Sequence, residues 1–372
     1  MDYTTTHSLT LPHELGNGSD SFKTPSTANT KQKVLIIVDK FGWSYDTIAK
    51  GLVKYQHNNN LTFDIVSVEE DLEDIEGRHE EYDLIFALGW TLVISKKKKH
   101  HYRPLLPFLD RSKLITGIHS HRSWDDYVSQ PDFCPVPPEE LLIELSKLKH
   151  INVISRRLFN IFQTAGLTNM TLTENGVDTD LFTPVQPINT DRSLPLVVGF
   201  SGSTHIPKHD DLKGCSEFIL PLSEIPNVEV NILGGRGAHQ VQRDEMPNLY
   251  NQIDLYICAS TSEGFSQSVL EASACGRGVI STRVGGCEDL IEEMKNGFFI
   301  NRDLTEIKRL IMKLETNREL VKQLGENNRA IVLEKYSWAI RVKEWLQFIE
   351  SNLPTRTIEP TTTSTSNREG SQ

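Results

Sequence analysis

The most constraining feature of this sequence is the stretch 258–286, which reads CASTSEGFSQSVLEASACGRGVISTRVGG. The apolar run at 255–258 predicts a buried strand, and small residues lead from it into Glu263, Gly264 and Phe265. A helix is expected over about 266–275, followed by Gly276 and a second strand over 279–282. Strand, turn, helix and strand form the repeating unit of a parallel α/β sheet, in which ligands bind at the carboxyl ends of the strands.

Two glutamates in this stretch are candidate ligand-binding residues. Glu263 follows the end of a strand, and Glu271 lies in the helix that comes next. Backbone N–H groups at the turn, together with the helix dipole, favour a phosphate there, and carboxylates beside it suit the hydroxyl groups of a sugar and a ribose. The structural alternative is that Glu271 forms a capping box with Ser268 and that Glu263 is a solvated turn residue.

The surrounding pattern resembles the donor-site signature of the family-4 glycosyltransferases, E-G-F-x-x-x-x-L-E-A-x-A-x-G. Gly278 departs from the family, which usually has proline at that position. The resemblance implies the GT-B fold, an α/β architecture of two Rossmann-like doubly wound domains that face a cleft. It also implies a retaining glycosyltransferase, which moves a sugar from a nucleoside-diphosphate sugar to an acceptor hydroxyl. The residues that match are Glu263, Gly264, Phe265, Leu270, Glu271, Ala272, Ala274 and Gly276.

The resemblance also assigns roles to residues of the donor site. Glu263 is expected to hold hydroxyls of the transferred sugar, and Glu271 the ribose. The N–H groups that follow Gly264, through Phe265 and Ser266, are expected to face the diphosphate. Tyr250 either borders the nucleotide base or serves in packing.

A cation for the diphosphate is expected early in the second domain. The segment after the strand at 196–200 contains Gly202 and then Ser203, which stands where the family commonly has a basic residue. Lys213 best matches the family's lysine because a glycine follows it, and Lys208 competes through its shorter spacing. With this cation the resemblance implies catalysis without a metal or another cofactor.

The first domain is expected to supply a catalytic-site histidine and the acceptor site. His119 and His121 both follow the strand at 114–118, and the sequence does not choose between them. After the first strand, at 34–38, many relatives have paired glycines, whereas this chain has Asp39-Lys40-Phe41-Gly42-Trp43. The acceptor side is therefore less predictable than the donor side.

Two other motifs have competing interpretations. Asp178 and Asp180 form a D-x-D pattern typical of metal sites in another glycosyltransferase fold, but NGVDTDLFTP at 175–184 resembles the family's interdomain segment. The run Lys96–Lys99 is either a solvated loop or a contact with anionic lipid headgroups, because each lysine near such a surface contributes about 1 kcal/mol.

Composition limits the class of protein. A net charge of −11 argues against nucleic acid as the main partner, and no apolar run is long enough to span a membrane. The five scattered cysteines and the absence of a signal-peptide pattern predict a cytoplasmic protein, with peripheral membrane contact as an open alternative.

The expected organisation has five parts: a disordered tail at 1–31, an acceptor domain at 32–185, a donor domain at 186–335, a helix at 336–353 that crosses back, and a disordered tail at 354–372. Two other functions stay open on the same frame, a nucleotide-sugar epimerase-like enzyme and a non-catalytic sugar-nucleotide binding module. The expected partners are a nucleotide-sugar and a glycan, lipid-linked or small-molecule acceptor; the oligomeric state is not predicted.

Overall fold

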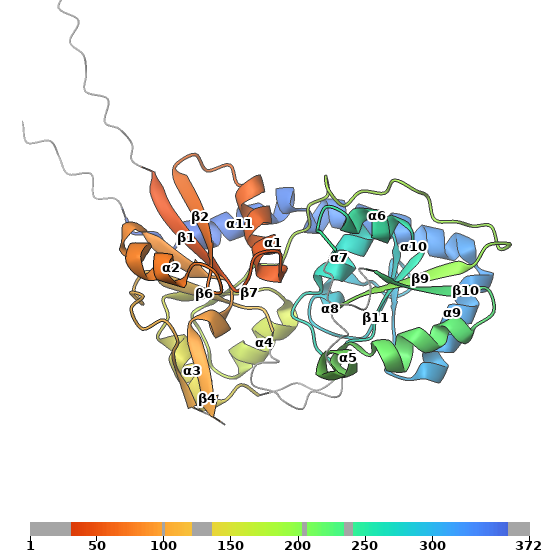
Figure 1. Ribbon diagram of the computed structural model, residues 1–372, viewed down its shortest axis with the longest axis horizontal. Helices are drawn as coiled ribbons and strands as arrows, with labels where there is room; N and C mark the ends of the chain where they lie inside the picture. Colours follow the sequence, from red (N-terminus) through yellow and green to blue (C-terminus); the bar gives the residue numbers. More distant parts are fainter. Residues whose placement is uncertain (1–30, 99–100, 121–135, 203–206, 234–240, 356–372) are drawn as a thin grey trace, which may run out of the picture.

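The structure is a computed structural model that describes residues 31–98, 101–120, 136–202, 207–233 and 241–355. It has two parallel sheets, each with helices packed around it, and Figure 1 shows the two halves side by side. The tails predicted to be disordered lie almost wholly outside the described residues. The α/β prediction with parallel sheets is confirmed.

The first sheet is built from apolar strands that are buried on both faces. Its strand order is β2-β1-β3-β6-β7-β8, with every neighbouring pair parallel. Residues Val34 to Val38 have at most 1% of their surface exposed, as expected for a central parallel strand. The strands are β1 (Gln32–Val38), β2 (Leu61–Ser67), β3 (Leu84–Ala87), β6 (Leu114–Ile118), β7 (His150–Val153) and β8 (Met170–Leu172).

Short helices connect these strands. Ser155 caps one of them, α4, because its hydroxyl accepts a hydrogen bond from the Leu158 N–H. The α-helices are α1 (Ser44–Tyr55), α2 (Leu72–Arg78), α3 (Glu139–Ser146) and α4 (Arg156–Thr164), with 3-10 turns η1 (His79–Glu81) and η2 (Trp90–Leu92).

The basic run at 96–99 lies at a hairpin. Strands β4 (Ile94–Lys98) and β5 (His101–Pro104) pair antiparallel, apart from both large sheets. The interpretation of this run as a loop is therefore wrong for Lys96 and Lys98, which pair with Tyr102 and His101 in the hairpin. Consecutive lysines lack the alternation of apolar and polar residues that would have indicated a strand.

The second sheet has the order β10-β9-β11-β12-β13 and is also parallel. Asp303 and Asn317 cap α9 and α10, since their side chains accept from N–H groups of the first turn. The strands are β9 (Leu196–Ser201), β10 (Val228–Leu233), β11 (Leu255–Cys258), β12 (Gly278–Ser281) and β13 (Gly297–Phe299). The helical segments up to the last helix are α5 (Pro207–Lys213), η3 (Cys215–Ile219), η4 (Leu220–Glu224), α6 (Met246–Asn251), α7 (Gln267–Ala274), α8 (Cys287–Leu290), α9 (Leu304–Thr316), α10 (Arg318–Ile331) and η5 (Val332–Tyr336).

The last helix, α11 (Trp338–Glu350), lies against the first half of the molecule (Figure 1). The indole of Trp345 packs near Phe86 of β3, with 6.0 Å between ring centroids, and its N–H donates to the Glu174 carbonyl at 3.0 Å. Gly51 in α1 has no side chain because a Cβ there would overlap with the ring of Trp338. The end of the chain therefore completes the core of the first half.

The segment between the two sheets is held by two arginines. Arg277, which is 1% exposed, donates to the carbonyl of Gln186 at 2.6 Å, and Arg329 donates to the carbonyl of Phe182 at 2.8 Å. The predicted boundary at residue 185 lies in this segment, and the division into domains stays a prediction.

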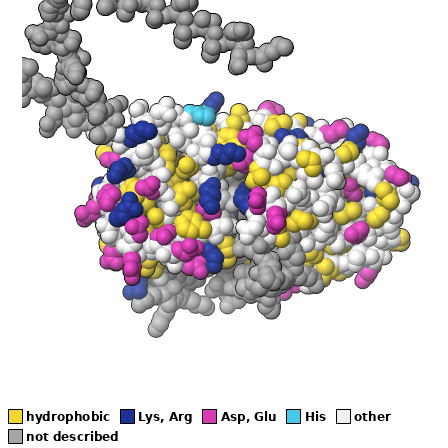
Figure 2. Space-filling model, turned by 45° about the horizontal axis from the view of Figure 1, so that its top comes forward, with side chains coloured by type: hydrophobic (Ala, Val, Ile, Leu, Met, Phe, Trp, Pro, Cys, Tyr) yellow, Lys and Arg dark blue, Asp and Glu magenta, His cyan; other side chains and the backbone are white. Residues whose placement is uncertain are grey.

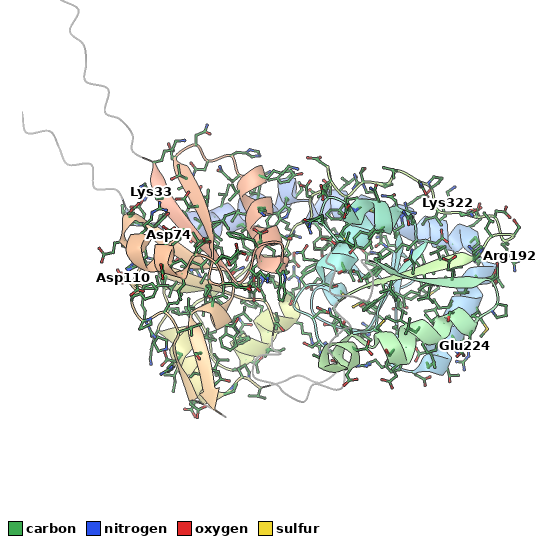
Figure 3. The ribbon with its side chains drawn as sticks, viewed as in Figure 1. Lys33, Asp74, Asp110, Arg192, Glu224 and Lys322 are labelled. Carbon is green, nitrogen blue, oxygen red and sulfur yellow. The ribbon has the colours of Figure 1, made fainter. Side chains whose placement is uncertain are left out.

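The surface has charges of both signs. Figure 2 shows lysine and arginine side chains interspersed with acidic ones over both halves on the face it presents. The side chains labelled in Figure 3 lie at the outer margins of the halves, away from their junction; there Asp74 pairs with Arg78 at 3.2 Å, and Arg192 with Glu315 at 3.8 Å. Among the described residues, no helix is both long and apolar enough to cross a membrane.

Candidate functional site

Four predicted site residues lie together where the two halves meet: His119, Glu263, Gly264 and Phe265. The turn after β11 approaches the loop after β6 so closely that a Cβ at Gly264 would overlap with the carbonyl oxygen of His119. Beside this contact lies a cavity of about 310 Å³ with walls from both halves. Its lining residues are Asp39, Trp43, Ser44, Tyr45, Thr91, Leu92, His119, Ser120, Ile154, Asn175, Glu263, Gly264 and Phe265.

Glu263 forms an ion pair with Lys213. The Lys213 ammonium at the end of α5 donates to Glu263 Oε1, and the two side chains are 23% and 11% exposed. Glu263 is thus neither isolated nor a solvated turn residue. Lys213, one of the two candidate lysines, is thus seen in contact with Glu263. The side chain of Lys208 lies outside what the structure describes.

Glu271 lies deeper and has two partners. Arg243 Nη1 donates to Oε1 at 2.7 Å, and the Tyr250 hydroxyl donates to Oε2 at 2.9 Å. Helix α7 begins at Gln267 after Ser266, which makes no side-chain cap, so the capping-box alternative for Ser268 and Glu271 is wrong. Both carboxylate oxygens are instead oriented by side chains from the segment before α7.

Tyr250 is fully buried. Its hydroxyl lies 3.3 Å from the Ser201 hydroxyl, which in turn lies 3.0 Å from the Tyr256 hydroxyl. Burial and the neighbouring Glu271 carboxylate raise the pKa of Tyr250 well above its usual value, so the phenol remains a donor. Tyr250 therefore packs in the interior and donates to Glu271, and its predicted place beside the base stays a prediction.

The turn between the glutamates is tightly packed. The Gly286 N–H donates to the Gly264 carbonyl at 2.9 Å, and a Cβ at Gly286 would overlap with the ring of Phe265. Phe265 is 6% exposed and packs edge-on against Tyr336, with centroids 5.6 Å apart. The Gly285-Gly286 turn thus fixes the backbone that precedes α7.

His119 is the described histidine at this junction. It is 8% exposed, its ring lies 5.0 Å from that of Tyr45, and its Nε2 has no hydrogen-bond partner. Burial lowers the pKa of His119 to about 3, so the imidazole is neutral at neutral pH. A neutral ring can exchange one hydrogen bond with a hydroxyl but brings no positive charge.

Several predicted residues lie outside the described part. These are Ser203 and His121, together with the side chains of Lys208 and of the run Lys96–Lys99. Gly202 is described at the end of β9, and its Cα lies near the Lys213 side chain, since a Cβ there would be 3.8 Å from Lys213 Cδ.

The D-x-D aspartates bind protein groups. Lys54 Nζ lies 2.7 Å from Asp178 Oδ2, and the Tyr55 hydroxyl lies 2.7 Å from Asp178 Oδ1 and also from Asp180 Oδ2. These contacts attach the interdomain segment to α1. Within the described ranges, no group of three or more His, Cys, Asp or Glu side chains is arranged to hold a metal ion.

Three residues of the site were not assigned roles from sequence. Arg243 belongs to no recognisable motif and lies in a segment of irregular structure. Asp39 follows β1 and Asn175 follows β8, and both line the cavity because the two strands belong to the same sheet. Their one usable signal is that a polar residue after a parallel strand faces the binding edge of the sheet.

A family model for the glycosyl transferases group 1 matches residues 237–331. This region contains both glutamates, Arg243 and Tyr250. The overall architecture agrees with it: a sucrose-phosphate synthase from Thermosynechococcus elongatus has a TM-score of 0.64 over 86% of this chain and 99% of its own, at 15% identity. The chain has the GT-B glycosyltransferase fold.

Another GT-B structure, HepE of Anabaena in complex with UDP-glucose, also has a TM-score of 0.64, covering 86% of this chain and 99% of its own at 16% identity. Sequence relatives match mainly in the second half. An uncharacterized glycosyltransferase from Methanocaldococcus jannaschii is 34% identical over 26% of this chain, and a probable sucrose-phosphate synthase from Thermosipho melanesiensis is 34% identical over 28%. These matches span about a quarter of each relative's length (27% and 25%).

Proposed function

We propose that this chain is a retaining glycosyltransferase that moves a sugar from a nucleoside-diphosphate sugar to an acceptor hydroxyl. The observation that carries the proposal is the pair of glutamates flanking the turn before α7. Each is held by a cation, Glu263 by Lys213 and Glu271 by Arg243, and Glu263 shares a cavity with His119 of the other half.

Lys213 is the residue proposed to stabilise the leaving group. Its ammonium is partly exposed and stands beside the turn whose N–H groups would face a diphosphate. As the sugar departs, negative charge grows on the diphosphate, and a preorganised cation lowers the energy of that transition state. Lys213 would then exchange part of its contact with Glu263 for the phosphate oxygens.

The two glutamates are proposed to act at different parts of the donor. Glu263 lines the cavity, so it would accept hydrogen bonds from hydroxyls of the transferred sugar. Glu271 is 5% exposed and fixed by Arg243 and Tyr250, which suits a rigid contact with ribose hydroxyls. The buried neutral His119 would bind a sugar hydroxyl without adding charge.

The reaction is proposed to need no metal, because the D-x-D carboxylates are engaged by Lys54 and Tyr55. Transfer should therefore continue when EDTA is added. Complete loss of activity on chelation, with recovery on adding manganese, would contradict this part of the proposal.

A uridine nucleotide is the first donor to test, because the HepE structure of the same fold contains UDP-glucose. The acceptor is proposed to be a glycan, lipid-linked or small molecule, and contact with anionic lipid through Lys96–Lys99 stays a proposal.

The test is a thermal-shift screen of nucleotides and nucleotide-sugars on the full chain. A ligand that binds the folded state alone stabilises it, by about 2.7 kcal/mol at a hundred times its Kd. We expect a nucleoside diphosphate and its sugar to raise the melting temperature, and product analysis to show sugar transfer with retained configuration. Absence of any shift across the common bases would contradict the proposal.

A further inference from the structure

The cavity between the halves has unsatisfied hydrogen-bonding atoms on its first-half wall. Asp39 Oδ1, His119 Nε2 and Asn175 Oδ1 are all buried and have no hydrogen-bond partner. Asn175 is 1% and His119 8% exposed. Buried polar atoms are almost always paired in folded proteins, so three unpaired atoms around one cavity indicate a ligand or water that pairs with them.

We propose that this cavity is the acceptor subsite and that it takes a neutral polyhydroxyl compound, held by Asp39 and Asn175 and stacked on Trp43. The inference rests on the proposed function and adds the chemical class of the acceptor. Glu263 and Lys213, which would hold the donor, form the opposite side of the junction.

The unpaired atoms of the cavity wall favour a ligand that donates hydrogen bonds. An ionised Asp39 and the Asn175 amide oxygen can only accept hydrogen bonds, and the neutral His119 ring adds one more nitrogen. Hydroxyl groups supply the matching donors. A phosphate presents acceptor oxygens and negative charge, and it would leave these atoms unpaired.

The charges of the cavity point to the same class. Two of the described lining residues, Asp39 and Glu263, have carboxyl groups, and none of them is a lysine or an arginine. Lys213 contacts Glu263 from the donor side. The neighbouring Lys40 forms its ion pair with Glu69 at 3.1 Å, its ammonium 5.9 Å from the centre of the Trp43 ring, and burial is the largest cause of the raised pKa of Asp39. An acceptor phosphate would therefore meet repulsion next to Asp39.

Trp43 adds an apolar platform. Its side chain lines the cavity yet is 50% exposed, although large aromatic groups are normally buried. The face of an indole is electron-rich and attracts the weakly positive C–H groups that project from one side of a sugar or cyclitol ring. Trp43 and Asp39 both belong to the segment after β1, where relatives of the resembled family often have paired glycines, so this chain's acceptor specificity is expected to be its own.

The experiment measures binding of matched neutral and phosphorylated probes to the full chain saturated with the nucleotide identified by thermal shift. The probes are D-glucose, glycerol and myo-inositol, each beside its monophosphate, followed by saturation-transfer NMR. We expect at least one neutral compound to bind and its monophosphate to bind about tenfold more weakly or worse, as one unfavourable charged contact would produce.

Two variants and a control assign the effect to the cavity. Asp39→Asn should weaken the neutral probe about tenfold and reduce the discrimination against its monophosphate, because a charged acceptor becomes neutral. Trp43→Ala should weaken the ring compounds more than glycerol. Glu73→Gln is the matched control, since the exposed Glu73 of α2 loses the same charge but does not line the cavity. It should change nothing.

The inference is overturned if none of the neutral probes binds, if the monophosphates bind equally or better, or if Asp39→Asn and Trp43→Ala behave like Glu73→Gln. Nucleotide binding is measured in the same samples. Its loss in the parent chain would contradict the proposed function itself, whereas normal nucleotide binding with any of the three results above contradicts the acceptor inference alone.

Discussion

At the scale of single residues, Glu263 and Glu271 differ in the partners that the fold gives them. Glu263 pairs with the partly exposed Lys213 and borders a cavity, whereas Glu271 accepts hydrogen bonds from Arg243 and a buried tyrosine. A partly exposed ion pair can rearrange when charge develops on the leaving group, whereas a buried carboxylate with two donors suits a contact that is the same before and after reaction. The two carboxylates should therefore affect different kinetic constants.

Conversion of each glutamate to glutamine tests this difference. Glu271→Gln replaces a charged acceptor, so nucleotide affinity should fall by about tenfold to a hundredfold, the equivalent of a lost charged hydrogen bond. Glu263→Gln should bind free nucleoside diphosphate nearly normally but transfer sugar slowly. Calorimetric titration and initial rates measure both effects. The exposed Glu229→Gln is the control, and parent-like rates in both test variants would contradict the donor-site assignment.

Lys213 gives a second test at this scale. Lys213→Ala removes the cation proposed to face the leaving group, and kcat should fall by roughly tenfold to a hundredfold. Lys208→Ala should be mild, because Lys213 is the lysine whose contact with Glu263 is described. Initial rates at saturating donor distinguish the two lysines. A larger loss for Lys208→Ala would show that the assignment of the family's lysine is wrong.

His119 should make folding stability depend on pH. Burial lowers its pKa from 6.5 to about 3, so between these values the unfolded chain binds a proton that the folded chain does not. The ring contributes no penalty above pH 6.5, and acidification to pH 5 should cost about 2 kcal/mol of unfolding free energy. Urea denaturation of His119→Asn at pH 7 and pH 5 should show a loss smaller by about this amount.

The exposed His57→Asn is the control for that measurement. It should lose stability on acidification as the parent does. If His119→Asn and His57→Asn show the same change between the two pH values, His119 is not buried in its neutral form.

The residues that sequence identified in the site are those with a motif around them. Glu263, Glu271 and Lys213 could be named because their spacing and flanking glycines resemble a family signature. Arg243, Asp39 and Asn175 have no such signature, since each acquires its partner or its cavity from residues far away in the chain. For the same reason the Tyr250 contact to Glu271 could not be separated from simple packing.

At the scale of elements, period and apolar runs predicted the strands well. The strands at 114–118, 170–172, 228–233 and 255–258 have the bounds that were expected. Those at 114–118 and 255–258 are fully buried, as their mainly apolar sequences suggest, whereas 170–172 and 228–233 are partly exposed strands at the edges of the sheets. The hairpin β4–β5 and the short β13 were not predicted. Consecutive lysines in β4 give no strand pattern, and the three residues of β13 are too few to show one, although they pair with β12 in the fold.

The turn before α7 yields a prediction about an element. Gly264→Ala places a methyl group against the His119 backbone, which cannot move aside as a side chain would. We expect the turn to shift, so that sugar transfer falls at least tenfold while the chain remains folded. Initial rates and circular dichroism measure the two properties.

Gly77→Ala is the matched control for that change. Gly77 lies in α2, and a Cβ there meets nothing within 4 Å, so alanine should leave activity unchanged and add up to about 1 kcal/mol of helix stability. Unchanged transfer in Gly264→Ala would mean that the two halves do not meet at this turn in the active state.

At the scale of the whole molecule, the site depends on how two sheets are held together. Arg157 of α4 pairs with Glu288 of α8 at 3.1 Å, and the Arg156 N–H donates to Asp289 at 3.1 Å. Helix α11 adds a second connection, because it follows the second sheet in the chain and packs in the core of the first half. The resemblance implied a cleft between the halves, but no local pattern reports these contacts, so most residues that line the cavity could not be named from sequence.

Trp345 tests this connection. Its side chain is fully buried, contacts Phe86 and Trp338, and donates its only N–H to the Glu174 carbonyl. Trp345→Ala leaves a large cavity and an unpaired carbonyl, and should lower the free energy of unfolding by about 3–5 kcal/mol.

Ile340→Ala on the same helix removes a side chain from a residue that is 42% exposed and should cost far less. Urea denaturation of both variants makes the comparison, with nucleotide affinity measured below the transition. Because the described partners of Trp345 lie in the first half and in α11, the affinity of the folded variant should equal that of the parent. Equal stability losses at the two positions would show that α11 is not part of the first core.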